Sequence, residues 1–449
     1  MTDVSTTRPG NGPARSKIDW FTATCVLVSN IIGGGIFTTT GFMARDLGDP
    51  ILIVSLWIVG GFLAIAAAMS YSELPAAMPR AGGDYVYLHH AYGPFIGFLS
   101  GWTSFTVGFG AGIAAASVSF ASYALRLVPQ ADDNSMASKI VALVLVWIMT
   151  AVHTAGTGAG GRLQRVLTTT KIFAIVLLIF GGFLFGHGSW DHVVEHSAHT
   201  NPGIGPLMVA LIFVLYTYLG WNVVGYIAGE IADPQRTIPR IVIGGTAFVA
   251  LLYVLLTLVY LYALPVTALA QPPILPVAEK AAAALWGPAS AQLVAALLCV
   301  SIAGGVSAMV WAGPRVYWAM AEDGIFPSFF KALTPTTGVP VRAIVLQSAW
   351  TSILILTGTF EQLVIFSGFV LSTFTALTIG SVVVLRRRHP QLPRPYRVPL
   401  YPVLPILTIA IMALIVAYSM IYRPFESLLG SAVVLAGIPF YFLWRKPEP

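Results

Sequence analysis

The stretch IIGGGIF, Ile31–Phe37, decides the fold of this chain because it interrupts an apolar segment, 19–45, with three successive glycines. An apolar segment of about 20 residues is long enough to cross a membrane as a helix. Single glycines in such helices usually allow close helix packing, but packing motifs space small residues four apart. Three in a row favour an interruption of the helix. Irregular backbone at membrane depth occurs only where protein or a cavity surrounds it. The run therefore predicts a helix that breaks at an internal cavity.

The composition indicates a membrane protein. Of the 449 residues, 57% are hydrophobic and only 9% are charged, and the mean hydropathy is +0.81. Soluble proteins carry about 25% charged residues. Too few charges are present to cover a water-facing surface, so we expect an all-α integral membrane protein whose solvent is the lipid bilayer. The two cysteines, Cys25 and Cys299, lie in apolar segments and predict no disulfide framework.

Hydropathy predicts twelve transmembrane helices, with uncertain ends. Four of these segments are longer than a perpendicular helix needs, so tilt or breaks must absorb the excess. The predicted segments are 19–45, 50–75, 93–126, 138–158, 162–185, 203–232, 238–264, 288–321, 341–359, 361–386, 402–422 and 425–444.

The distribution of basic residues predicts the orientation. With the N-terminus in the cytoplasm, eighteen of the 24 Lys and Arg residues fall on the cytoplasmic side and five on the outer side. This asymmetry follows the positive-inside rule and predicts that both termini are cytoplasmic, in a multi-pass protein of the cell inner membrane. It also explains the net charge of +6 better than a nucleic-acid partner does. Residues 1–18 lack the features of a secretory signal and are expected to form a short cytoplasmic tail.

A second irregular stretch, YTYLGWN at Tyr216–Asn222, lies in the sixth predicted helix. Paired interruptions at matching places in two halves are typical of transporters with internal repeats. The spacing of five helices predicts a LeuT-like five-plus-five inverted repeat, with helices 1 and 6 broken in mid-membrane. We expect the first repeat over 19–185 and the second over 203–386. Residues 402–449 then hold helices 11 and 12 and a short cytoplasmic tail.

Broken helices offer a specific chemistry. A half-helix that begins inside the membrane exposes N–H groups, which suit a carboxylate. A half-helix that ends there exposes carbonyls, which suit an ammonium group. An α-amino acid carries both groups on one carbon, so the two interruptions predict an amino acid substrate without requiring a charged side chain.

Five motifs, in order along nearly the whole chain, resemble the amino acid–polyamine–organocation (APC) superfamily, near its L-amino-acid transporter (LAT) branch. The first stretch looks like the family's IIGSGIF, and YTYLGWN with the following segment looks like its sixth-helix signature. The motifs are IIGGGIF (Ile31–Phe37), PRAGGDY (Pro79–Tyr85), YTYLGWN with PQRTIPR (Tyr216–Asn222 and Pro234–Arg240), AMAEDGIFP (Ala319–Pro327) and PRPYRVP (Pro393–Pro399).

The resemblance implies roles for particular residues. The substrate carboxylate would bind the backbone N–H groups of Gly34 and Gly35, and the ammonium would bind backbone carbonyls at both interruptions. Tyr216 would be the aromatic gate that covers the substrate from outside, and Asn222 would lie beside the pocket. The ammonium carbonyls would be those of Ile31, Tyr216 and Leu219. The predicted substrate-binding set is Ile31, Gly33, Gly34, Gly35, Tyr216, Thr217, Leu219, Gly220 and Asn222.

This chain departs from the family pattern at three places. Gly34 stands where a serine is common, so a hydroxyl contact to the carboxylate is missing. Leu219 stands where many relatives have Gly or Asp, and it either narrows the pocket or points away. No cysteine lies near Asp132 and Asp133, where animal relatives bond a glycoprotein partner. We therefore expect no disulfide-linked heavy chain.

Lys171 lies inside the fifth predicted helix. A charge near the membrane centre costs roughly 3 kcal/mol, so this lysine either has partners or extends its ammonium group to the cytoplasmic interface. Position alone favours neither. The resemblance implies that the ammonium occupies the volume that sodium fills in sodium-coupled relatives, and links the first broken helix to the eighth around Gly304–Ser307. It thus implies sodium-independent transport by exchange or proton coupling.

Neutral L-amino acids are the expected substrates, because no Asp or Glu lies in the middle of the first, third, sixth, eighth or tenth predicted helix. A transporter for cationic amino acids or polyamines is the alternative within the superfamily. A channel or a membrane sensor is the alternative in another class, although the chain shows no soluble output domain. No nucleophile motif, metal-ligand cluster or phosphate-binding loop is present, so we expect no enzyme, cofactor or metal site.

Overall fold

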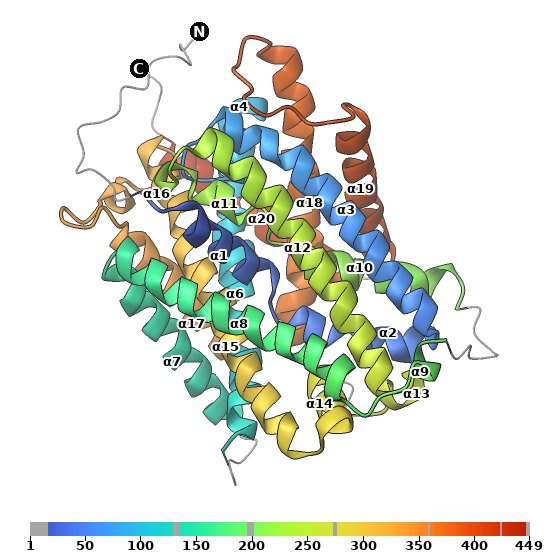
Figure 1. Cartoon of the computed structure of the whole chain (residues 1–449). Coiled ribbons are helices and arrows are strands. Elements are labelled where there is room, and N and C mark those ends of the chain that lie inside the picture. The colour runs from blue at the N-terminus through green and yellow to red at the C-terminus, as the bar shows by residue number, and fades with distance from the viewer. Residues whose placement is uncertain are drawn as a thin grey trace.

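A computed structural model describes residues 17–128, 135–194, 202–272, 276–357, 360–422 and 424–445. The described residues form a bundle of helices in which a single isolated bridge, between Ile18 and Ile231, is the one β contact (Figure 1). Most of the N-terminal tail and the region of Asp132 and Asp133 lie outside the described residues.

Long apolar helices make up most of the bundle. These helices coincide with the hydrophobic segments of the sequence. An α-helix satisfies its own backbone hydrogen bonds in lipid, so hydrophobic segments favour this structure. They are α3 (Pro50–Ala77), α5 (Pro94–Thr103) continued by a π-helical turn, η2 (Ser104–Phe109), and α6 (Gly110–Arg126), α7 (Ser135–Thr154), α8 (Thr157–Phe185), α10 (Ile204–Tyr218), α12 (Pro234–Ala263), α15 (Ala289–Ala312), α17 (Val341–Thr357), α18 (Phe360–Arg388), α19 (Val403–Tyr422) and α20 (Pro424–Trp444).

Shorter helices flank or connect these. They are α1 (Trp20–Ile31), η1 (Gly35–Phe37), α2 (Thr39–Leu47), α4 (Asp84–Tyr92), α9 (Asp191–Val194), α11 (Val223–Tyr226), η3 (Ala228–Glu230), α13 (Val266–Leu269), α14 (Val277–Trp286), α16 (Pro314–Glu322) and η4 (Ser328–Lys331).

Ten helical segments among the described residues are long and apolar enough to cross a membrane. The predicted segments 19–45 and 341–359 are the exceptions, because α1 has 12 residues and α17 has 17. Every predicted segment thus corresponds to helix, but the count of twelve crossings and the inverted repeat stay predictions. Large apolar side chains such as Phe62, Phe173 and Phe185 are more than 65% exposed, as expected for residues that face lipid.

The first helix lies at the centre of the bundle. Helix α1 packs against α8, α12 and α15, and α3 and α12 lie side by side along the bundle (Figure 1). Its side chains Ala23, Val26 and Leu27 are fully buried. Helices α4 and α16 lie at one end of the bundle, and α9, α13 and α14 lie at the other (Figure 1). The end of α1 is therefore enclosed by protein, which is where an irregular backbone can persist.

Candidate functional site

The first helix is interrupted at the glycines. Helix α1 ends at Ile31, and residues 32–34 are not helical before η1 begins at Gly35. The Phe37 N–H donates to the Gly34 carbonyl at 3.2 Å, and the Thr38 N–H donates to the Gly35 carbonyl at 3.0 Å. In the described part of the chain, the N–H groups of Gly34 and Gly35 donate no hydrogen bond. Two backbone donors are thus available to a ligand.

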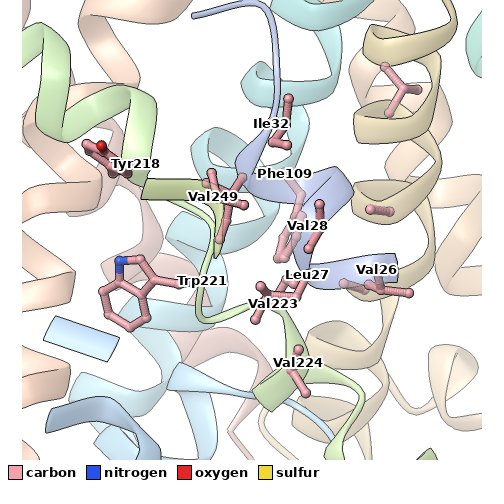
Figure 2. Packing of buried hydrophobic residues seen from close by; sticks show 14 of the residues in the cluster. Val26, Leu27, Val28, Ile32, Phe109, Tyr218, Trp221, Val223, Val224 and Val249 are labelled. Atoms are coloured by element: carbon pink, nitrogen blue, oxygen red, sulfur yellow. The ribbon is translucent and has the colours of Figure 1, made fainter. Parts of the chain in front are cut away.

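A second interruption follows α10. The helix ends at Tyr218, Leu219 is extended, and residues 219–222 form turns before α11 begins at Val223. Gly220 has a φ of +109°, and a Cβ there would lie 2.6 Å from the Asn30 amide nitrogen. The Asn30 amide donates to the Gly220 carbonyl at 2.9 Å. Only glycine fits this conformation and this close approach. Figure 2 shows both interruptions together, with Ile32 after the end of α1 and the non-helical chain between Tyr218 and Val223.

The two interruptions are in direct contact. A Cβ on Gly35 would lie 2.7 Å from the Thr217 hydroxyl oxygen, and that hydroxyl lies 3.3 Å from the Thr39 hydroxyl. The buried Tyr253 hydroxyl, on α12, donates to the Ile31 carbonyl at 2.9 Å and lies 3.4 Å from the Thr217 carbonyl. The two irregular stretches that the sequence analysis paired therefore lie next to each other in the fold.

Open space lies beside the glycine run. A Cβ on Gly33 would meet nothing within 4 Å, and a Cβ on Gly34 would meet only the Ser119 hydroxyl oxygen, at 3.6 Å. Gly33, Gly34 and Gly35 are all partly exposed although their neighbours Ile32 and Ile36 are buried. The Ser119 hydroxyl of α6 therefore lies near the backbone of Gly34, and both a hydroxyl and a backbone N–H are donors that an anionic group accepts.

The three carbonyls predicted to bind the substrate ammonium accept different numbers of hydrogen bonds from the protein. The Ile31 carbonyl accepts from the Tyr253 hydroxyl and from the Gly33 N–H at 2.9 Å, so both of its lone pairs are used. The Tyr216 carbonyl accepts one bond, from the Leu219 N–H at 3.1 Å. Within the described ranges, the Leu219 carbonyl accepts none. Leu219 and Tyr216 therefore keep free acceptor capacity in this conformation.

Tyr216 and Asn222, the two residues of the second interruption whose side chains were given roles, have different surroundings. Tyr216 is half-buried, and its ring lies 3.9 Å from the position of a Cβ on Gly368, in α18. The Asn222 amide donates to the Asp84 carboxylate at 2.9 Å and lies 3.4 Å from the Tyr226 hydroxyl. The Asn222 amide nitrogen is therefore directed toward Asp84.

Lys171, on α8, is buried and fully hydrogen-bonded. Its side chain is 1% exposed, so its ammonium group does not extend to the surface of the bundle. The ammonium donates to the Ser29 carbonyl and the Ser29 hydroxyl, each at 3.2 Å, and to the Ile32 carbonyl at 2.5 Å. A Cβ on Gly304, in α15, would lie 3.6 Å from the same nitrogen. The lysine thus joins α8 to the end of α1 beside α15.

Four polar residues near the interruptions were not predicted from the sequence. They are Asn30, Asp84, Ser119 and Tyr253. Asn30 had a usable signal, because an amide in an apolar segment directly before a glycine run needs a partner. Ser119 and Tyr253 had none, since single serines and tyrosines are common in membrane helices and only the tertiary fold places them here.

Comparisons with known proteins indicate the family of the chain. The chain is 28% identical to the large neutral amino acids transporter small subunit 2 of Homo sapiens, over 98% of this chain and 83% of that protein. It is 27% identical to the Asc-type amino acid transporter 1 of Mus musculus, over 97% of this chain and 83% of that protein. It is 29% identical to the serine/threonine exchanger SteT of Bacillus subtilis (strain 168), over 96% of this chain and 97% of that protein.

The family model described as amino acid permease matches residues 18–439, which includes both interruptions and Lys171. All three similar proteins carry names of amino acid transporters or exchangers and none carries the name of an enzyme. The chain is a membrane-embedded transport protein and belongs to the amino acid permease family of the APC superfamily.

Proposed function

We propose that this permease is a sodium-independent transporter of neutral L-amino acids that works by alternating access at the two interruptions. The observation that carries the proposal is the pair of N–H groups at Gly34 and Gly35 that donate no hydrogen bond, on partly exposed backbone in contact with the second interruption. The names of its relatives, which specify large neutral amino acids in one case and serine and threonine in another, support the same substrate class.

The substrate carboxylate would accept from Gly34, Gly35 and the Ser119 hydroxyl. A hydrogen bond to a charged group contributes about 1.5–3 kcal/mol, so three donors are enough to hold the anionic end. The ammonium would donate to the free carbonyl of Leu219 and to the second lone pair of Tyr216. Binding at the Ile31 carbonyl requires that the Tyr253 hydroxyl moves away, because that carbonyl already accepts two bonds.

Lys171 would hold the first interruption in place of a metal cation, because its ammonium already contacts two backbone carbonyls and a hydroxyl there. A site filled by a fixed cation leaves no need for sodium. The driving force would then come from exchange or from protons, and the chain would work without a disulfide-linked heavy chain. We place the protein in the cell inner membrane as a LeuT-like five-plus-five repeat with both termini in the cytoplasm.

The experiment is counterflow of labelled L-alanine in proteoliposomes that contain the purified protein. We expect uptake against unlabelled internal alanine to persist when sodium is replaced by choline, and alanine, serine and leucine to compete. Strict sodium dependence would exclude the proposed role of Lys171. Stronger competition by arginine or putrescine would favour the cationic alternative, and flux without counterflow would indicate a channel.

A further inference from the structure

Asp84 is a buried carboxylate without a basic partner. It begins α4 directly after the loop 79–83, and its side chain is 7% exposed. The other two fully buried acidic side chains among the described residues form ion pairs, Glu73 with Arg386 and Glu230 with Arg315. Among the described residues, Asp84 forms none. A buried carboxylate without a cation carries a large desolvation penalty, so its presence needs a reason.

The contacts of Asp84 fix the chain that follows the second interruption. One carboxylate oxygen, Oδ2, accepts from the Asn222 amide at 2.9 Å and from the Tyr226 hydroxyl at 2.9 Å. The Gly82 N–H donates to the Tyr226 carbonyl at 3.1 Å. The other carboxylate oxygen, Oδ1, is buried and accepts no hydrogen bond. Asp84 therefore holds α11 by one oxygen and leaves the other unsatisfied.

The same loop is also attached to α16. Arg80 forms an ion pair with Asp323 at 2.6 Å, and the Tyr85 hydroxyl donates to Asp323 at 2.6 Å. The segment 80–85 is thus a strap between α11 and the end of α16. Movement of α11 away from α16 must release one side of this strap, and Asp84 is the only charged side chain on the α11 side that these contacts include.

The groups that face Asp84 are tyrosines. They are Tyr71 from α3, Tyr87 from α4 itself and Tyr226 from α11, all of them buried, and the Tyr87 hydroxyl has no hydrogen-bond partner. Phe109 packs edge-on against the Tyr226 ring at 5.1 Å and closes the cluster on that side. Burial raises the pKa of Asp84 to about 6, although the hydrogen bonds from Tyr226 and Asn222 oppose this shift. A proton can therefore bind the unsatisfied carboxylate oxygen.

We propose that Asp84 is a proton-binding site that controls the attachment of α11 to the strap during transport. One carboxylate oxygen of Asp84 takes up one proton from water. An O–H bond forms there, and no other covalent bond in the protein forms or breaks. The neutral acid is a weaker acceptor for Asn222 and Tyr226 than the carboxylate. Protonation therefore loosens α11 and favours opening of the chain beyond the second interruption, and loss of the proton closes it again. This inference rests on the proposed transport function.

The test is the rate of alanine counterflow between about pH 5 and pH 8 for the unchanged protein, Asp84→Asn, Asp84→Glu and Glu279→Gln. The unchanged protein should exchange roughly tenfold faster at the acidic end, because weakening of charge-assisted hydrogen bonds lowers the barrier to opening. Asp84→Asn, which resembles the neutral acid, should be fast at all pH values. Asp84→Glu should keep a pH transition.

Glu279 is the matched control, because it is a half-buried carboxylate on α14 whose pKa burial also raises, although Arg126 lies 3.7 Å away. Its conversion to glutamine should leave the pH profile unchanged. A pH profile of Asp84→Asn that equals that of the unchanged protein would overturn the proposal, as would a flat profile of the unchanged protein.

Infrared difference spectroscopy of the detergent-solubilised protein tests the proton site without transport. The proposal requires a protonated-carboxyl band that titrates over this pH range and is absent from Asp84→Asn. If the band is present and no amino acid exchanges, only the proposed function fails. If the unchanged protein exchanges alanine and no such band appears, only the proton site fails.

Discussion

The two interruptions are held by buried groups of opposite charge. At the first, the Lys171 ammonium donates to the carbonyls that the end of α1 leaves free and to one hydroxyl. At the second, the Asp84 carboxylate accepts from Asn222 and Tyr226, where α11 begins.

The difference lies in how completely each charge is satisfied. Lys171 has three donors and three acceptors, so any displacement breaks hydrogen bonds without gaining others. Asp84 has one oxygen with two donors and one oxygen with none. The first interruption is therefore a fixed support, whereas the second can change its protonation state at a small cost. The following predictions test this contrast.

The largest effect is expected for Lys171→Met. Removal of the ammonium leaves buried acceptors of Ser29 and Ile32 without a donor, and breaking such a buried charged contact costs about 3–5 kcal/mol. We expect alanine counterflow to fall roughly a hundredfold or more, whereas Asp84→Asn should remain fast. Lys139→Met is the control, at a half-buried lysine on α7 whose ammonium donates to the Leu356 carbonyl. Activity of Lys171→Met within about twofold of the unchanged protein would contradict the fixed-support role.

The next effect separates two glycines of the same run, Gly33 and Gly35. A Cβ at Gly35 would lie 2.7 Å from the Thr217 hydroxyl oxygen, whereas a Cβ at Gly33 would meet nothing within 4 Å. Overpacking of this kind costs about 1–3 kcal/mol. We expect Gly35→Ala to reduce counterflow roughly tenfold and Gly33→Ala to reduce it less than about threefold. Equal effects would show that the contact between the interruptions is not important for transport.

A smaller effect is expected for Ser119→Ala, which removes one predicted donor to the carboxylate. The concentration of alanine that gives half-maximal counterflow should rise about fivefold, equivalent to about 1 kcal/mol. Gly34→Ser should reverse this in the Ser119→Ala background, because a side chain at position 34 would point toward the Ser119 hydroxyl. Unchanged affinity in Ser119→Ala would remove this residue from the site.

The smallest effect is expected for Tyr253→Phe. The hydroxyl donates one neutral hydrogen bond to the Ile31 carbonyl, which contributes about 1 kcal/mol to the stability of the first interruption. A melting temperature a few degrees lower in detergent is the expected result. Tyr422→Phe, at an exposed tyrosine, should leave the melting temperature unchanged. If both variants melt alike, Tyr253 does not support the end of α1.

The sequence indicated where the backbone is irregular, because glycine runs and helix ends are local properties; that these stretches break two helices in mid-membrane stays a prediction. The predicted break at Ile31–Phe37 agrees with the end of α1 at Ile31, whereas α10 extends to Tyr218, two residues beyond the start of the predicted irregular stretch. From its position in the sequence, Lys171 could equally have partners inside the protein or extend its ammonium group to the cytoplasmic interface. The fold decides between them, because the partners at Ser29 and Ile32 are about 140 residues away in the chain.

The sequence could not reveal which backbone groups remain free. The Ile31 carbonyl is occupied by a hydroxyl from Tyr253, and the Asn222 amide is occupied by Asp84. Both contacts join residues far apart in the chain. Asp84 itself lies in a short polar stretch between apolar segments, yet its contacts with Asn222 and Tyr226 lie in the interior, and it is one of the least solvated carboxylates in the described ranges.

The central claim is that the two interruptions bind the α-carboxylate and the α-ammonium of one amino acid. Competition against labelled L-alanine in sodium-free counterflow tests it most directly, with L-serine, L-alaninamide and L-lactate as competitors. L-alaninamide lacks the carboxylate and L-lactate lacks the ammonium, so the account predicts that L-serine competes and that both analogues fail. Competition by L-alaninamide or L-lactate as strong as that of L-serine would contradict it.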